Sequence, residues 1–155
     1  MKVHIITYVN APINLVFNLA RNMDFHAYSV RNAGESIVDG RKHGLIEIDE
    51  TVTFKGKHFG FMQIFKAKII KLEFPNEFTD VMVKGSFKSF IHVHKFFDNN
   101  GIIKMTDEII YQCPFGYLGK AFDWVFLNSY VNKILKSRAK DIKECCENNK
   151  WKKYL

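Results

Sequence analysis

His92 and His94 are separated by a single residue in a segment that has the composition of a β-strand. Side chains two residues apart on a strand point to the same face, so both imidazoles share one surface. If residues 98–101 form the turn that follows, the antiparallel ladder sets His92 opposite Asp107. The same ladder sets His94 opposite Met105. A carboxylate beside an imidazole fixes its tautomer and raises its pKa, so His92 and Asp107 are candidates for acid/base catalysis.

Further polar residues fall on the same face when the neighbouring hairpins are built in the same way. A turn at residues 55–58 sets Glu50 opposite Gln63. A reversal near residues 72–73 sets Gln63 opposite Asp80, and the next hairpin brings Asp80 near the two histidines. These residues define a predicted polar belt that crosses five adjacent strands: Glu50, Gln63, Asp80, His92 and Asp107, with His94 alongside.

The predicted belt lies on a face that is otherwise apolar. Burying unpaired carboxylates and imidazoles costs on the order of several kcal/mol, so the belt must be hydrogen-bonded internally or meet a polar group of a ligand. Arg138, on the apolar stripe of a C-terminal helix, is the predicted counter-charge. The expected ligand-binding face also includes these apolar residues: Phe61, Phe65, Phe78, Met82, Phe90, Met105, Tyr111 and Phe122. With 15 Phe, six Tyr and two Trp, the chain has enough aromatic surface to line a pocket.

The same residues leave two alternatives to ligand contact open. His92 and His94 could chelate a metal ion together with Asp80 or Glu50. The belt could also be a purely structural hydrogen-bond network. The residues predict no cofactor, because neither a glycine-rich phosphate loop nor a GxSxG turn occurs in the chain.

Charge and cysteine content narrow the class of protein. The net charge is +7, but the basic residues are spread along the chain, which argues against a nucleic-acid partner. The three cysteines, two of them adjacent at Cys145 and Cys146, give no disulfide framework, so we expect a cytoplasmic location. No apolar run approaches the roughly 20 residues of a transmembrane segment, and the N-terminus does not resemble a signal peptide.

The elements that would position these residues follow from hydrophobic periodicity. Residues 2–9 alternate as a strand, Pro12 opens a first short helix, and a second short helix is expected at residues 24–30. About six hairpin-connected strands are expected between residues 35 and 113. A long helix follows, and one apolar stripe predicts that it lies on the sheet: Leu118, Phe122, Val125, Phe126, Tyr130, Ile134, Leu135, Arg138 and Ile142. The whole chain, 1–155, is predicted to form one α+β domain.

This order of elements, together with particular segments, resembles the SRPBCC proteins of the START and birch-pollen-allergen superfamily. The segments that carry the resemblance are 10–12, 34–35, 44–46, 78–87, 92–96, 106–108 and 111–119. The resemblance implies a helix-grip fold, in which a seven-stranded curved sheet in the order 1-7-6-5-4-3-2 surrounds the last helix and a cavity. In that layout the residues expected to rim the cavity are His26, Tyr28, Phe115, Tyr117 and Phe122.

The resemblance implies less about function than about fold, because its members include lipid and hormone carriers as well as polyketide cyclases. We expect a carrier or sensor for a small, mostly apolar but amphipathic molecule. The alternative is a cyclase- or dehydratase-type enzyme acting on a polyketide-like substrate, with His92 as the base and Asp107 as the residue that orients it.

Overall fold

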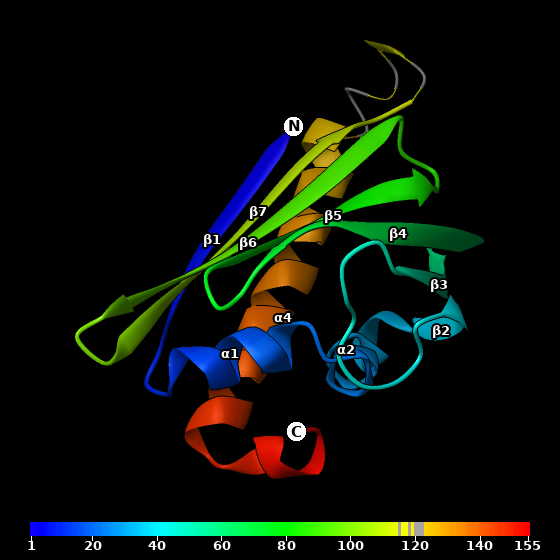
Figure 1. Ribbon diagram of the computed structural model, residues 1–155. Coiled ribbons are helices and arrows are strands. Elements are labelled where there is room, and N and C mark those ends of the chain that lie inside the picture. Colours follow the sequence, from blue (N-terminus) through cyan, green and yellow to red (C-terminus); the bar gives the residue numbers. More distant parts are fainter. Residues whose placement is uncertain (115, 118, 120–122) are drawn as a thin grey trace.

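A computed structural model describes residues 1–114, 116–117, 119 and 123–155. Two short helices follow the first strand, six more strands follow the helices, and a long helix leads to the C-terminus (Figure 1). The elements are β1 Lys2–Val9, α1 Ile13–Ala20, α2 Met23–Ser29, η1 Arg31–Ala33, β2 Ser36–Gly40, β3 Thr51–His58, β4 Phe61–Glu73, β5 Glu77–Lys84, β6 Ser89–Asn99, β7 Ile102–Gln112, the π-helical turn η2 Asp123–Leu127, α4 Asn128–Glu147 and η3 Lys150–Lys153.

The strands form one antiparallel sheet in the order β1-β7-β6-β5-β4-β3-β2. Because consecutive strands from β2 to β7 are joined as hairpins, each lies beside its neighbour in sequence, and β1 completes the sheet next to β7. The sheet curves around α4, and α1 and α2 lie toward the C-terminal end of that helix (Figure 1). The predicted fold class and strand order are therefore confirmed.

Local sequence accounts for the two short helices. Pro12, with φ of −58°, immediately precedes α1, whose residues Val16 and Phe17 are buried against the sheet. Asn22 caps α2, because its side chain accepts a hydrogen bond from the backbone N–H of Phe25. These two helices close one end of the space between the sheet and α4.

The predicted register of the β6–β7 hairpin is wrong by two residues. The turn consists of Asn100 and Gly101 alone, with φ values of 55° and 88°, so Asn99 pairs with Ile102. Asn-Gly favours this tight turn because both of its residues tolerate positive φ. Consequently His94, and not His92, lies opposite Asp107. Since the shift is an even number of residues, every side chain stays on its predicted face.

The predicted registers of the β3–β4 and β4–β5 pairs are also wrong. Residues 55–58 lie within β3, and the chain turns at Phe59 and Gly60, both of which have positive φ. Gln63 therefore lies opposite Gly56, not opposite Glu50. Asp80 lies opposite Ile69, not opposite Gln63, and two irregularities shift the register between β4 and β5.

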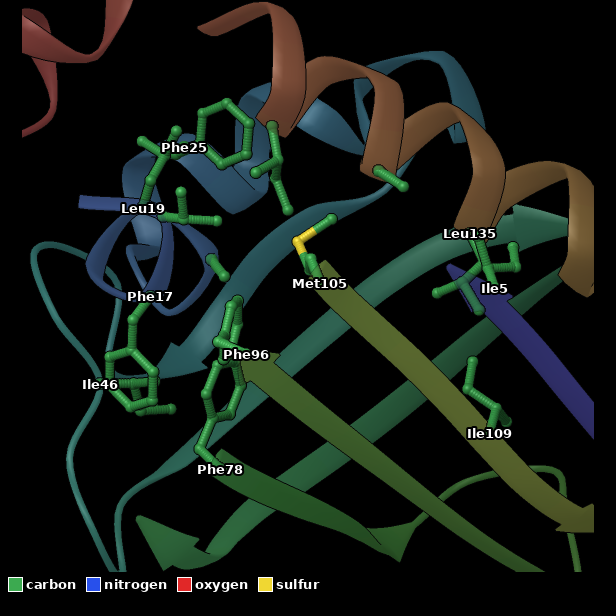
Figure 2. Close-up of a cluster of buried hydrophobic side chains, with 14 of the residues drawn as sticks. Ile5, Phe17, Leu19, Phe25, Ile46, Phe78, Phe96, Met105, Ile109 and Leu135 are labelled. Atoms are coloured by element: carbon green, nitrogen blue, oxygen red, sulfur yellow. The ribbon is translucent and has the colours of Figure 1, made fainter. Parts of the chain in front are cut away.

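The core fills the space between the sheet, α1 and the C-terminal half of α4. Phe17 of α1 is fully buried and meets Phe78 and Phe96 edge to face, with ring centroids 5.5 and 5.3 Å apart (Figure 2). Leu135 of α4 belongs to the same buried hydrophobic cluster as Ile5 of β1 (Figure 2). Among the helices that the structure describes, none combines the length and apolar character needed to cross a bilayer.

The apolar stripe predicted for the long helix does not continue to its start. Leu118 and Phe122 lie outside the described residues. Val125 and Phe126 are exposed, and Trp124 beside them is 78% exposed. The reason is the π-helical turn η2, which contains more residues per turn than an α-helix and rotates these side chains away from the sheet.

Candidate ligand-binding site

A cavity of about 230 Å³ lies between the inner face of the sheet, α2 and the first half of α4. Its wall is mainly apolar and includes Val52, Phe54, Phe65, Phe78, Phe90 and Leu135. Phe59 and Ile64, near the β3–β4 turn, belong to the lining and are also exposed to solvent. The cavity therefore opens toward this turn.

A cluster of five charged or titratable side chains adjoins one wall of the cavity. We call it the polar cluster; its members are Asp80, His92, His94, Asp107 and Arg138. Asp80 on β5 lies opposite His92 on β6, and His94 on β6 lies opposite Asp107 on β7. The alternation of strand side chains directs all four inward, and Arg138 reaches them from α4.

His94 is held between two carboxylates. Its Nδ1 lies 2.8 Å from Asp107 Oδ1, and its Nε2 lies 3.2 Å from Asp80 Oδ2. An ionised carboxylate can only accept a hydrogen bond, so both ring nitrogens donate and the ring is an imidazolium. Burial acts to lower the pKa of His94, but the bonds to Asp107 and Asp80 outweigh it, and the pKa is raised above its ordinary value. The ring of Phe78 stacks on this imidazolium at 4.0 Å.

His92 faces the same two carboxylates, but its ring is neutral whereas the ring of His94 is protonated. Its Nε2 donates to Asp107 Oδ1 over 3.2 Å, and its Nδ1 lies 3.9 Å from Asp80 Oδ2. Burial and the neighbouring charge of His94 lower the pKa of His92, so this ring is neutral. The predicted contact between His92 and Asp107 is thus present, although it runs diagonally across the ladder.

The charges of the polar cluster balance one another. Burial acts to raise the pKa of Asp107 and of Asp80, but hydrogen bonds and charge from the histidines lower both pKa values, so both are carboxylates. The His94 imidazolium and the Arg138 guanidinium supply two positive charges. A cluster of two anions and two cations carries no net charge, which reduces the cost of burying it.

Arg138 links the polar cluster to α1. Its Nη2 donates to the backbone oxygen of Ala20 over 2.6 Å, and its Nη1 lies 3.9 Å from Asp107 Oδ1. Its Nε is buried and has no hydrogen-bond partner among the described residues. Arg138 also lines the cavity, so part of its hydrogen-bonding capacity remains for a ligand or for water.

His26 of α2 adds an uncharged polar group to the cavity lining. Its ring stacks on Phe54 with centroids 4.6 Å apart. Burial, together with the positive charge of Arg138, holds the pKa of His26 well below its ordinary value. A neutral imidazole offers one donor and one acceptor to a bound molecule.

A second polar group near the opening of the cavity was missed by sequence reasoning. His58 Nδ1 lies 2.6 Å from the hydroxyl of Tyr130, and His58 Nε2 lies 3.2 Å from Glu35 Oε1. All three residues line the cavity, and they join β3 to α4. The alternation of β3 could have placed His58 on the inner face, but its pairing with a helix residue 72 positions away has no local signal.

The structure brings eight of the predicted ligand-binding residues to the cavity lining: Gln63, Phe65, Phe78, Asp80, Phe90, His92, His94 and Arg138. Asp107 lies behind the two histidines. Met105 and Tyr111 are buried in the core and do not appear in the lining of the described cavity. Met82 packs near Gly85, also outside the lining.

Two other predicted residues lie away from the cavity. Glu50 accepts a hydrogen bond from Arg41 Nε over 2.8 Å at a separate surface depression, so it is not part of the polar cluster. Phe61 is 74% exposed at the start of β4. Glu50 differs from prediction because it lies just before β3 begins at Thr51 and its carboxylate pairs with Arg41. Phe61 differs because the β3–β4 turn, which begins four residues later than expected, lies directly before it.

The predicted rim is only partly as expected. His26 lies in the lining, whereas Tyr28 packs against the guanidinium of Arg31 and Tyr117 is exposed. Phe115 and Phe122 fall outside the described residues.

A seven-stranded antiparallel sheet that curves around a long C-terminal helix, with two short helices after the first strand, defines the helix-grip fold of START- and birch-pollen-allergen-like proteins. No family model matches the chain, and no curated protein matches it. Solved structures do match along almost the whole length.

The ginseng major latex-like protein 151 from Panax ginseng is 18% identical, with a TM-score of 0.65 over 94% of this chain and 97% of that protein. Ara h 8.0201 is 10% identical, with a TM-score of 0.64 over 92% and 97%. The KanY protein is 12% identical, with a TM-score of 0.71 over 95% and 97%. These similarities confirm the fold that the sequence resemblance implied.

Proposed function

We propose that this protein binds one small, mostly apolar molecule with a polar group in the cavity between the sheet and α4, as a carrier or sensor. The observation that carries the proposal is the position of the polar cluster, which faces a mainly apolar cavity from one wall. Pockets of this kind bind by burying apolar surface and orient their ligand with a few polar groups.

The size and charge of the cavity narrow the ligand class. An apolar cavity of about 150 Å³ holds one benzene ring, so about 230 Å³ suits a molecule of one or two rings. His92 and Asp80 are 12% and 16% exposed, more than the other histidine and carboxylate of the cluster. We therefore expect the polar end of the ligand to contact His92, Asp80 and Arg138.

One observation favours the enzymatic alternative as a second candidate. His92 is neutral, lines the cavity and donates a hydrogen bond from its Nε2–H group to Asp107, so its Nδ1 has a free lone pair. That arrangement would suit proton abstraction in a cyclase or dehydratase reaction. If the protein is such an enzyme, His92→Gln abolishes turnover.

Ligand binding can be tested in two stages. Native mass spectrometry of gently purified protein, followed by solvent extraction, looks for a retained molecule. Isothermal titration with naphthalene-2-carboxylate, which has two fused rings and one carboxylate, then measures occupancy of the cavity in stripped protein.

The matched variants are Ala67→Leu and Ile110→Phe. Ala67 is buried in the cavity lining, so a larger side chain reduces the volume and is expected to weaken binding by about tenfold or more. Ile110 is exposed on β7, so its variant adds apolar surface without altering the cavity. The proposal is wrong if no molecule is retained and neither titration nor substitution reveals a saturable site.

A further inference from the structure

Each of the two carboxylates, Asp107 and Asp80, faces one ring nitrogen of His92 and one ring nitrogen of His94. His92 Nε2 and His94 Nδ1 both lie within 3.2 Å of Asp107 Oδ1. The remaining nitrogens, His92 Nδ1 and His94 Nε2, lie 3.9 and 3.2 Å from Asp80 Oδ2. When the rings are neutral and donate to Asp107, both lone pairs therefore converge on the space beside Asp80.

These converging atoms have the spacing of a metal site. One potential ligand atom from each of Asp80, His92 and His94 lies within 4.8 Å of the other two. Transition metals bind imidazole nitrogen and carboxylate oxygen at about 2.0–2.2 Å, which separates tetrahedral ligand atoms by about 3.4 Å. Small side-chain rotations would bring the three atoms to that separation.

Asp107 supplies the support that metal-binding histidines usually have. Such histidines commonly donate their other N–H group to a carboxylate, which fixes the tautomer and the ring orientation. Here a single oxygen of Asp107, whose side chain is 3% exposed, serves both rings. The three proposed metal-binding residues lie on the paired strands β5 and β6, and Asp80 is directly opposite His92.

We propose that Asp80, His92 and His94 bind one divalent transition-metal ion, of the zinc or ferrous type, with an open coordination position toward the cavity. Two imidazoles and one carboxylate are a ligand set that suits these ions. The open position faces the cavity because all three residues belong to its lining.

The site is tested on untagged, full-length protein dialysed against a chelator and free of organic ligand. Failure here therefore does not bear on the cavity proposal. Co²⁺ titration followed by visible absorption reports coordination geometry, and Zn²⁺ calorimetry measures stoichiometry and affinity. We expect one ion per chain and the intense visible bands of four-coordinate Co²⁺.

Two variants and one control locate the ion. His92→Phe removes one ligand, and Asp80→Asn replaces another while keeping its size; each is expected to weaken Zn²⁺ binding by at least about tenfold. His43→Asn is the control, because His43 pairs with Asp24 on the surface, its Nδ1 being 2.6 Å from Oδ1. Circular dichroism checks folding, and Asp80→Asn decides the matter if His92→Phe does not fold.

The proposal is overturned by a wild-type stoichiometry near zero. It is also overturned if both site variants keep wild-type affinity, or if His43→Asn loses affinity as strongly as they do.

Discussion

His94 and Asp107 lie directly opposite each other on β6 and β7, and His94 Nδ1 donates to Asp107 Oδ1 over 2.8 Å. Both side chains are almost completely buried, so the charge of each is stabilised by the opposite charge of the other and not by water. Asp80 completes the arrangement on the other side of the imidazole. The stability of the sheet and the chemistry of the cavity wall therefore depend on the same residues.

Asp107→Asn is expected to lower the free energy of unfolding by about 3 kcal/mol, because it leaves the buried His94 imidazolium with one charged partner instead of two. Urea denaturation at pH 7 measures the change. Glu108→Gln is the matched control, since Glu108 pairs with Lys2 on the outer face, where solvent screens the interaction. Equal losses in the two variants would contradict the central role of Asp107.

The pH dependence of stability should reflect His94. Its pKa is raised on folding, so its contribution is complete below the unfolded value of about 6.5 and is lost as the pH rises through the folded pKa. Unfolding free energies measured between pH 6 and 9 should therefore fall less in His94→Gln than in the wild type. Parallel curves for the two proteins would rule out this contribution.

At acid pH, the pH dependence of stability should reflect His26 and three members of the polar cluster. The pKa values of His26 and His92 are lowered, so the unfolded chain takes up protons below about pH 6.5 that the folded protein does not. Asp80 and Asp107, whose pKa values are lowered too, stabilise the fold above about pH 4 and lose that contribution as the pH falls.

We expect NMR titration to show the His92 ring neutral at a pH where His94 is fully protonated, and the reverse order would exclude this assignment.

Tyr130→Phe should speed the release of a bound molecule. The Tyr130 hydroxyl lies 2.6 Å from His58 Nδ1 and joins α4 to β3 near the opening of the cavity. Removing one hydrogen bond of about 1 kcal/mol corresponds to about a fivefold faster dissociation rate. Stopped-flow displacement of naphthalene-2-carboxylate measures the rate, and Tyr8→Phe, on an exposed side chain of β1, should leave it unchanged.

Phe17→Ala tests the contact between α1 and the sheet. Phe17 is fully buried and meets the rings of Phe78 and Phe96, so its loss should cost about 3–5 kcal/mol in thermal or urea unfolding. Phe61→Ala makes the same chemical change at an exposed position and should alter stability by at most about 0.5 kcal/mol. A small effect at Phe17 would mean that this core can repack around the gap.

Much of the fold was predictable because strand and helix periodicity is local. The alternation of β6 and β7 correctly placed His92, His94 and Asp107 on the inner face. That assignment survived a register error of two residues, because the face of a strand repeats every two residues. The element order and the strand order were likewise predictable from the pattern and from the resemblance.

Contacts within the site were less predictable, because they depend on turn lengths and on packing between distant segments. The two-residue turn at Asn100 and Gly101 decides that His94 lies opposite Asp107. The ion pair with Arg41, just before β3 begins, keeps Glu50 away from the cluster. The pairing of His58 with Tyr130 follows from the way α4 packs on the sheet. Sequence periodicity states which face a residue occupies, whereas its partner and its charge depend on folding in three dimensions.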